Sequence, residues 1–102
     1  MNNKIFRFFL LTGLMLLSLG AFAQSKVTGK VTDSHGEEII GATVTEVGTK
    51  NATITDFDGN YSITVGPNAT LHISYIGYKD IDVKVNGRAV VNVTIMDDET
   101  AL

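Results

Sequence analysis

A run of oxygen-bearing side chains, Asp56-Phe57-Asp58-Gly59-Asn60, is the part of this sequence best suited to bind a ligand. Two aspartates one residue apart, followed by glycine, are the residue types that open an oxygen-rich calcium loop. The continuation does not fit an EF-hand, because Val65 stands where a bidentate glutamate is required. Aspartate in such a segment also accepts backbone N–H groups and shapes a turn. We favour this second interpretation, in which Asp56, Asp58 and Gly59 are structural turn residues and no metal is bound.

Side chains that could act as a nucleophile or a base are few. The chain has no cysteine and two histidines, His35 and His72. None of the serines lies in the glycine-flanked elbow of hydrolases. We expect His35 in an exposed turn and His72 on the polar face of a strand. The sequence therefore predicts no catalytic residue, no cofactor, no metal site and no enzymatic activity.

The elements that must position these residues are strands, because apolar and polar residues alternate with a period of two. Turn residues separate the alternating segments, including Asp58-Gly59 and Ile76-Gly77-Tyr78, in which Gly77 is expected to be a structural turn residue. Short strands at this spacing are typical of a sandwich or a barrel. The predicted strands cover residues 26–32, 40–45, 53–55, 61–65, 71–75, 80–85 and 91–95.

The alternation also predicts which side chains form the core. Each apolar set lies on one face of its strand, and two such faces must cover each other. The predicted core consists of Val27, Val31, Ile40, Ala42, Val44, Tyr61, Ile63, Val65, Leu71, Ile73, Ile81, Val83, Val91 and Val93.

The first 23 residues have the pattern of a secretory signal peptide. Lys4 and Arg7 precede a nearly continuous apolar run, which ends in Ala21-Phe22-Ala23. We predict cleavage between Ala23 and Gln24, and hence an exported protein. The alternative is an uncleaved membrane anchor. Because no cysteine follows the predicted cleavage site, lipid attachment to a new N-terminal cysteine is excluded.

The charges exclude some classes of partner. All eleven acidic residues follow the predicted signal peptide, whereas two of the eight basic residues lie within it. No basic cluster is present, so neither nucleic acid nor an anionic membrane surface is an expected partner. We predict one domain over residues 24–96. Asp97-Asp98-Glu99 then begins an acidic linker that covers residues 97–102.

Several of these segments together resemble a known family. In order and spacing they are similar to a carboxypeptidase-regulatory-like β-sandwich domain, as found in the N-terminal extension of SusC/RagA-type TonB-linked outer-membrane transporters of Bacteroidota. The resemblance extends from about Val27 to Met96. It rests on VTGKVTD at 27–33, GE at 36–37, IGATV at 40–44, GT at 48–49, TITD at 53–56, DGNYSI at 58–63 and LHISYIGYK at 71–79. Glu38 and Ala52 depart from the family pattern, which often has Pro and Gly at these turn positions.

The resemblance implies a fold and a place in the cell. The fold would be a seven-stranded antiparallel Greek-key sandwich of the transthyretin-like type. The domain would lie on the periplasmic side of the outer membrane, beside the plug and barrel of a transporter and the energising TonB-type machinery. Membrane association would come only through a parent barrel.

Two functions remain open on the sequence alone. In the first, the chain is a non-enzymatic N-terminal domain of a TonB-dependent transporter for glycans or peptides, and the product is truncated near the start of the linker. In the second, it is a free-standing exported module that binds a protein or a glycan. The acidic run at 97–99 favours the first function, because a free domain has less need of a linker.

Overall fold

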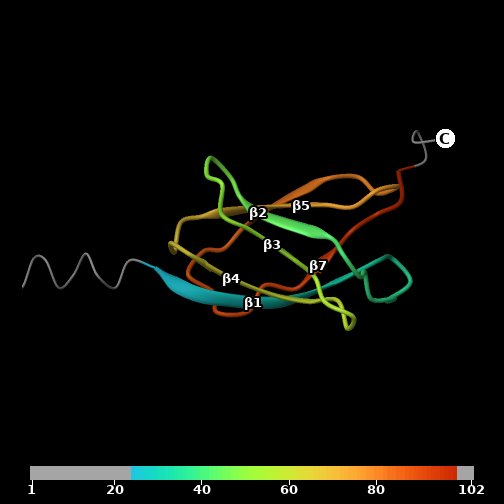
Figure 1. The fold of residues 1–102 in the computed structure, drawn as a ribbon, viewed down its shortest axis with the longest axis horizontal. Helices are drawn as coiled ribbons and strands as arrows, with labels where there is room; N and C mark the ends of the chain where they lie inside the picture. Colours follow the sequence, from blue (N-terminus) through green and yellow to red (C-terminus); the bar gives the residue numbers. More distant parts are fainter. Residues whose placement is uncertain (1–23, 99–102) are drawn as a thin grey trace, which may run out of the picture.

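The computed structural model describes residues 24–98 of this chain (Figure 1). The predicted signal peptide, residues 1–23, and the last four residues of the predicted linker, 99–102, lie outside the described residues.

Within residues 24–98, seven strands form two sheets that face each other. The first sheet has the order β4-β1-β7 and the second the order β3-β2-β5-β6. The all-β class predicted from the alternation is confirmed, and of the two expected arrangements, sandwich or barrel, the domain adopts the two-sheet sandwich. The strands are β1 (Ser25–Thr32), β2 (Thr43–Glu46), β3 (Ala52–Ile54), β4 (Asn60–Val65), β5 (Thr70–Ser74), β6 (Ile81–Lys84) and β7 (Val93–Thr94).

The prediction of an entirely antiparallel sandwich is wrong for one strand pair. β7 runs parallel to β1, with Val31 opposite Val93. The physical reason is the route of the chain: β6 ends near the start of β1, and residues 85–92 cross to the first sheet at that end. β7 therefore has to run in the same direction as β1. The other paired strands are antiparallel.

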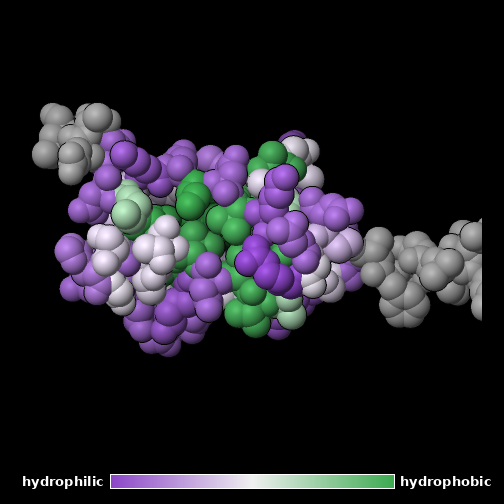
Figure 2. All heavy atoms as spheres, turned by 180° about the vertical axis from the view of Figure 1, so that it is seen from behind, coloured by the Kyte–Doolittle hydropathy of each residue, from purple (hydrophilic) through white to green (hydrophobic). Residues whose placement is uncertain are grey.

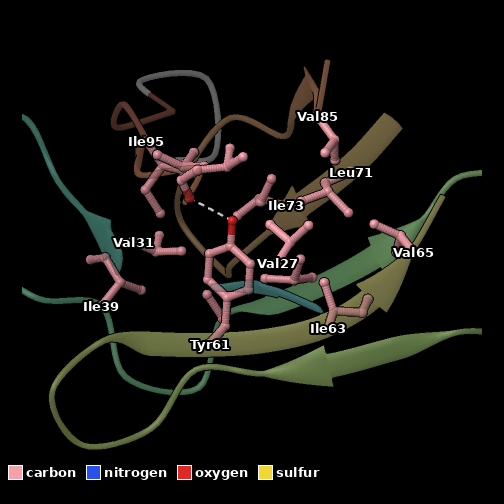
Figure 3. Packing of buried hydrophobic residues seen from close by; sticks show 14 residues of the cluster. Val27, Val31, Ile39, Tyr61, Ile63, Val65, Leu71, Ile73, Val85 and Ile95 are labelled. Carbon is pink, nitrogen blue, oxygen red and sulfur yellow. Dashed lines mark hydrogen bonds between the residues drawn. The ribbon is translucent and has the colours of Figure 1, made fainter. Parts of the chain in front are cut away.

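The core lies between the two sheets (Figure 3). Valine and isoleucine dominate it, as expected of side chains that pack on a pleated surface. Its largest side chains with almost no exposure are Leu71, Ile73 and Ile95. The full buried set is Val27, Val31, Ile39, Ala42, Val44, Tyr61, Ile63, Val65, Leu71, Ile73, Val85, Val91, Val93 and Ile95.

The prediction that Ile40 is a core residue is wrong. Ile40 is 49% exposed, whereas its neighbour Ile39 is 6% exposed and occupies the core. Residues 40 and 41 form a turn instead of continuing the strand, and Gly41 has a φ of 82°. The turn interrupts the alternation, so β2 begins at Thr43, three residues later than predicted.

Edge strand β6 is less well covered than predicted. Ile81 and Val83 are partly buried side chains that pack against the core from its edge, whereas Val85 and Ile95 are core residues that the predicted set omitted. Seen from behind, the molecule shows apolar side chains gathered in the middle of the face, with hydrophilic side chains around them (Figure 2).

Tyr61 places a polar group in this core. Its hydroxyl donates a hydrogen bond of 2.5 Å to the backbone carbonyl of Val91 (Figure 3). Gly29 makes room for this bond: a Cβ atom there would lie 1.9 Å from the Val91 oxygen and 2.8 Å from the Tyr61 ring. Burial raises the pKa of Tyr61, so its hydroxyl keeps the proton that it donates.

Candidate functional site

The segment around Asp56 is a tight turn between β3 and β4. Asp56 Oδ1 accepts hydrogen bonds from the backbone N–H groups of Asp58 and Asn60, both of 2.9 Å. The Gly59 N–H donates to the Asp56 carbonyl, and Gly59 has a φ of 77°. One carboxylate therefore satisfies two backbone donors while glycine takes the left-handed conformation.

Asp33 builds the same turn after β1. Asp33 Oδ1 accepts hydrogen bonds from the N–H groups of His35 and Glu37, at 2.8 and 2.9 Å. The Gly36 N–H donates to the Asp33 carbonyl, and Gly36 has a φ of 81°. The sequence predicted a turn at this segment, with His35 exposed in it, but not that Asp33 holds the turn. The signal that could have revealed it is the shared Asp-x-x-Gly spacing of residues 33–36 and 56–59.

The two turns are joined through β1. The N–H of Val31 donates to the Gly59 carbonyl, and the N–H of Ile39 donates to the Val31 carbonyl. Thr55 adds a buried link, since its hydroxyl donates to the Ile39 carbonyl at 2.6 Å and accepts from the Ala42 N–H at 2.9 Å. These bonds hold the turns together at the end of the domain where β1 finishes.

In both aspartate turns a carboxylate oxygen is engaged by backbone N–H groups. Within residues 24–98, no group of three or more histidine, cysteine or acidic side chains is arranged to hold a metal ion. Asp56 already accepts two N–H groups through one carboxylate oxygen, and Asp58 lies exposed beside it. The arrangement fixes the backbone of the turn.

His72 lies on the outer face of the second sheet, where Asp82 is its cross-strand partner. His72 Nδ1 lies 2.6 Å from Asp82 Oδ1, and Nε2 lies 3.2 Å from Asp80 Oδ2. The hydrogen bond to Asp82 is the main cause that raises the pKa of His72, with a further contribution from Asp80. Sequence reasoning placed His72 on the polar face but missed both partners, because their proximity depends on strand register.

The turn that contains Gly77 lies beside the outgoing chain. The N–H of Tyr78 donates to the Tyr75 carbonyl, and Gly77 between them has a φ of 86°. The N–H of Lys79 donates to the Met96 carbonyl, and that of Asp98 donates to the Gly77 carbonyl. The first two residues of the predicted linker therefore lie against this turn.

Two shallow grooves hollow the described surface. One, of about 810 Å³, lies along the first sheet and includes Thr28, Lys30 and Asn92 in its lining. The other, of about 450 Å³, lies beside the Gly77 turn. It is lined by Gly41, Thr43, Ser74, Tyr75, Ile76 and Asp80.

The predicted signal-cleavage pair lies at the border of the described chain. Ala23 is outside the described residues, and Gln24 is exposed just before β1. Between residues 24 and 98, no helix is long and apolar enough to cross a membrane.

These features define a small two-sheet β-sandwich domain with aspartate-held turns. Residues 27–102 match the CarboxypepD_reg-like domain, and the chain belongs to that family.

The sequence identity of this chain to receptor proteins is higher than its identity to solved structures. The chain is 45% identical over 74 residues to a TonB-dependent receptor of Formosa agariphila, and 42% identical over 89 residues to the TonB-dependent receptor SusC of Bacteroides thetaiotaomicron. These alignments cover 72% and 86% of this chain but 7% and 9% of the receptors. A second Formosa agariphila TonB-dependent receptor is 36% identical across 99% of this chain, which is 10% of that receptor. The chain thus spans a tenth or less of the length of these relatives.

The likeness to solved structures is evidence for the fold of this chain and for nothing further. A chain of the Coh3ScaB-XDoc_M1ScaA type II cohesin-X-dockerin complex of Acetivibrio cellulolyticus superimposes with a TM-score of 0.59 at 20% identity, covering 72% of this chain and 58% of that chain. A second mutant of this complex gives a TM-score of 0.54 at 22% identity, covering 69% and 52%.

Proposed function

We propose that this chain is the N-terminal, periplasm-facing domain of a TonB-dependent outer-membrane transporter for a nutrient such as a glycan or a peptide. The observation that carries the proposal is the 42% identity to SusC across 86% of this chain, together with the match to the N-terminal tenth of such receptors. The domain contributes no chemistry of its own. It serves as a folded extension before the rest of the receptor.

The finer parts of the proposal follow from the sequence. Residues 1–23 direct export and are removed between Ala23 and Gln24, the domain spans residues 24–96, and a linker begins at Asp97. The partners are the plug and barrel of the same transporter and the energising machinery on the periplasmic side. The fold is of the transthyretin-like Greek-key type. It differs from the entirely antiparallel arrangement that we predicted in that β1 and β7 are parallel.

The direct test replaces the matching segment of Bacteroides thetaiotaomicron SusC with this chain. A SusC variant that lacks the segment is the baseline, and intact SusC is the positive control. We expect the chimera to restore uptake of the receptor's own substrate above the baseline. An equal amount of each receptor in the outer membrane must be verified by immunoblotting.

A different result would assign a different role. If the chimera behaves like the deletion variant although it is equally abundant, the proposed function is wrong. If the purified chain instead binds a polysaccharide with micromolar affinity, it is a free binding module.

A further inference from the structure

An apolar surface is left uncovered at the end of the domain where the chain leaves β7. We call it the distal surface and define it by the apolar residues on or next to the Gly77 turn and Gly41. Tyr75 and Ile76 line the groove there, Tyr78 lies beside Tyr75, Met96 is hydrogen-bonded to Lys79 through its carbonyl, and Ile40 precedes Gly41 in the chain. Ile76 is 89% exposed, Met96 56% and Ile40 49%. Single exposed apolar residues need no explanation, but a group of them beside a groove marks an interaction site.

The distal surface has a defined shape. The Tyr75 and Tyr78 rings lie 5.8 Å apart at an angle of 48°. Ile76 is in the turn between them and also lines the groove of about 450 Å³ next to Gly41. The Tyr75–Tyr78 hydrogen bond and the bonds to the outgoing chain hold this turn in place. A preformed aromatic and aliphatic anchor of this kind loses little conformational entropy when it docks.

Carboxylates surround the distal surface. Asp80 lines the groove. Desolvation by the surrounding protein raises the pKa of Tyr78, and the charges of Asp97, Asp33 and Glu37 raise it further. The backbone of Tyr78 also pairs with that of Asp97 in an isolated β-bridge. Lys79 is the one lysine in residues 33–41, 75–80 and 96–98. A complementary partner must therefore present an apolar centre with lysine or arginine at its rim.

The position of the distal surface indicates where that partner is. Met96 and Asp98 are hydrogen-bonded to the Gly77 turn, so the chain that continues toward the receptor starts at the edge of this surface. A tethered partner has an effective concentration on the order of millimolar, so a small and weak interface is sufficient.

We propose that the distal surface docks onto an apolar, lysine- or arginine-rimmed surface of the receptor segment that follows this domain. The inference rests on the proposed function, because it requires the domain to be part of a receptor. It adds the face that makes the contact and the chemistry of the partner.

The test is site-specific photo-crosslinking in the SusC chimera. One variant carries p-benzoyl-phenylalanine in place of Ile76. The matched control carries it in place of Val47, which is 51% exposed in the turn between β2 and β3, near the end where β1 begins (Figure 1). We expect crosslinks from position 76 to residues of the receptor that follow the domain, at a yield severalfold above that from position 47. Peptide mapping should find lysine or arginine next to the crosslinked residues.

A second variant tests the chemistry of the contact. Ile76→Asp introduces a charge into the apolar centre without disturbing the core. It is combined with p-benzoyl-phenylalanine in place of Ile40, and we expect it to reduce crosslinking from position 40 severalfold. Val47→Asp is its control and should leave that crosslinking unchanged.

Two outcomes would overturn the inference. Equal yields from positions 76 and 47 would show that the distal surface is not a contact, and crosslinks from position 76 to a separate protein would show that the partner is not the receptor itself. Uptake by the chimera distinguishes the two proposals. If uptake is restored while position 76 gives no receptor crosslink, the proposed function stands and the docking surface is wrong.

Discussion

Asp33 and Asp56 accept the same pair of backbone hydrogen bonds in two turns with the same Asp-x-x-Gly spacing. In each turn the carboxylate accepts hydrogen bonds from the N–H groups two and four residues later. The glycine three residues after the aspartate has a left-handed conformation. The environments differ, since Asp33 is 7% exposed and Asp56 lies on the surface. The same pair of hydrogen bonds can therefore be compared at a buried aspartate and at an exposed one.

Replacing each aspartate with alanine should show this difference. We expect Asp56→Ala to lower the free energy of unfolding by about 1 kcal/mol and Asp33→Ala by about 2 kcal/mol, because the hydrogen bonds of Asp33 are partly buried whereas those of Asp56 are exposed to water. Urea denaturation measures both values. Asp58→Ala is the control and should stay within about 0.5 kcal/mol. Equal losses for the two turns would contradict the role of burial.

The glycines of the same turns separate backbone strain from steric clash. Gly36 and Gly59 have nearly the same φ, but a Cβ at Gly36 would meet no atom within 4 Å, whereas one at Gly59 would lie 2.9 Å from the Val31 oxygen. Gly36→Ala should cost about 1 kcal/mol from the left-handed conformation alone. Gly59→Ala should cost clearly more in the same urea measurement. If the two costs were equal, the contact of Gly59 with β1 would be of no importance to stability.

Gly29 and Tyr61 form a second testable pair. Gly29→Ala should destabilise the domain by about 3 kcal/mol or more, because the new Cβ would overlap the Val91 carbonyl. Tyr61→Phe keeps the ring and removes only the hydroxyl, so we expect a loss of about 1–2 kcal/mol from the unpaired buried carbonyl. Thermal unfolding followed by circular dichroism compares the two. A neutral Tyr61→Phe variant would argue against the hydrogen bond seen in Figure 3.

The His72 cluster should make stability depend weakly on pH. The pKa of His72 is raised above 6.5 in the folded protein, chiefly by the hydrogen bond to Asp82. Its contribution is therefore fully present below about pH 6.5 and is lost as the pH rises through the folded-state pKa. The pair is exposed, so the difference between wild type and His72→Gln should be less than about 1 kcal/mol at low pH and should disappear at high pH.

Calcium provides a direct check on the Asp56 turn. Because the Asp56 carboxylate is already engaged by backbone N–H groups, adding calcium should not raise the melting temperature measurably. Asp56→Asn should respond to calcium in the same way as the wild type. A calcium-dependent rise that Asp56→Asn abolishes would restore the metal-binding interpretation.

Much of the fold was predictable because alternation with a period of two is a local signal. It located all seven strands and most of the core, including Val27, Ile63 and Ile73. It failed at Ile40, where two adjacent isoleucines are equally apolar and only the turn at Gly41 decides which of them is buried.

The features that could not be predicted depend on contacts between distant residues. The parallel pairing of β1 and β7 follows from the place where the chain crosses between sheets, and the alternation carries no record of strand direction. The proximity of His72 to Asp80 and Asp82 follows from the β5–β6 register. The role of Asp33 was accessible in principle, because its spacing to Gly36 repeats that of Asp56 to Gly59.

The parallel β1–β7 pair has a mechanical consequence. The described chain begins beside β1 at one end of the domain and leaves after β7 at the other (Figure 1). Tension applied between these two ends pulls the neighbouring strands in opposite directions along their length. The hydrogen bonds from Val91 N–H to the Thr28 carbonyl and from Ile95 N–H to the Thr32 carbonyl are then loaded together in shear, and not broken one after another as in unzipping. The domain should therefore resist unfolding when a force is applied between its two ends.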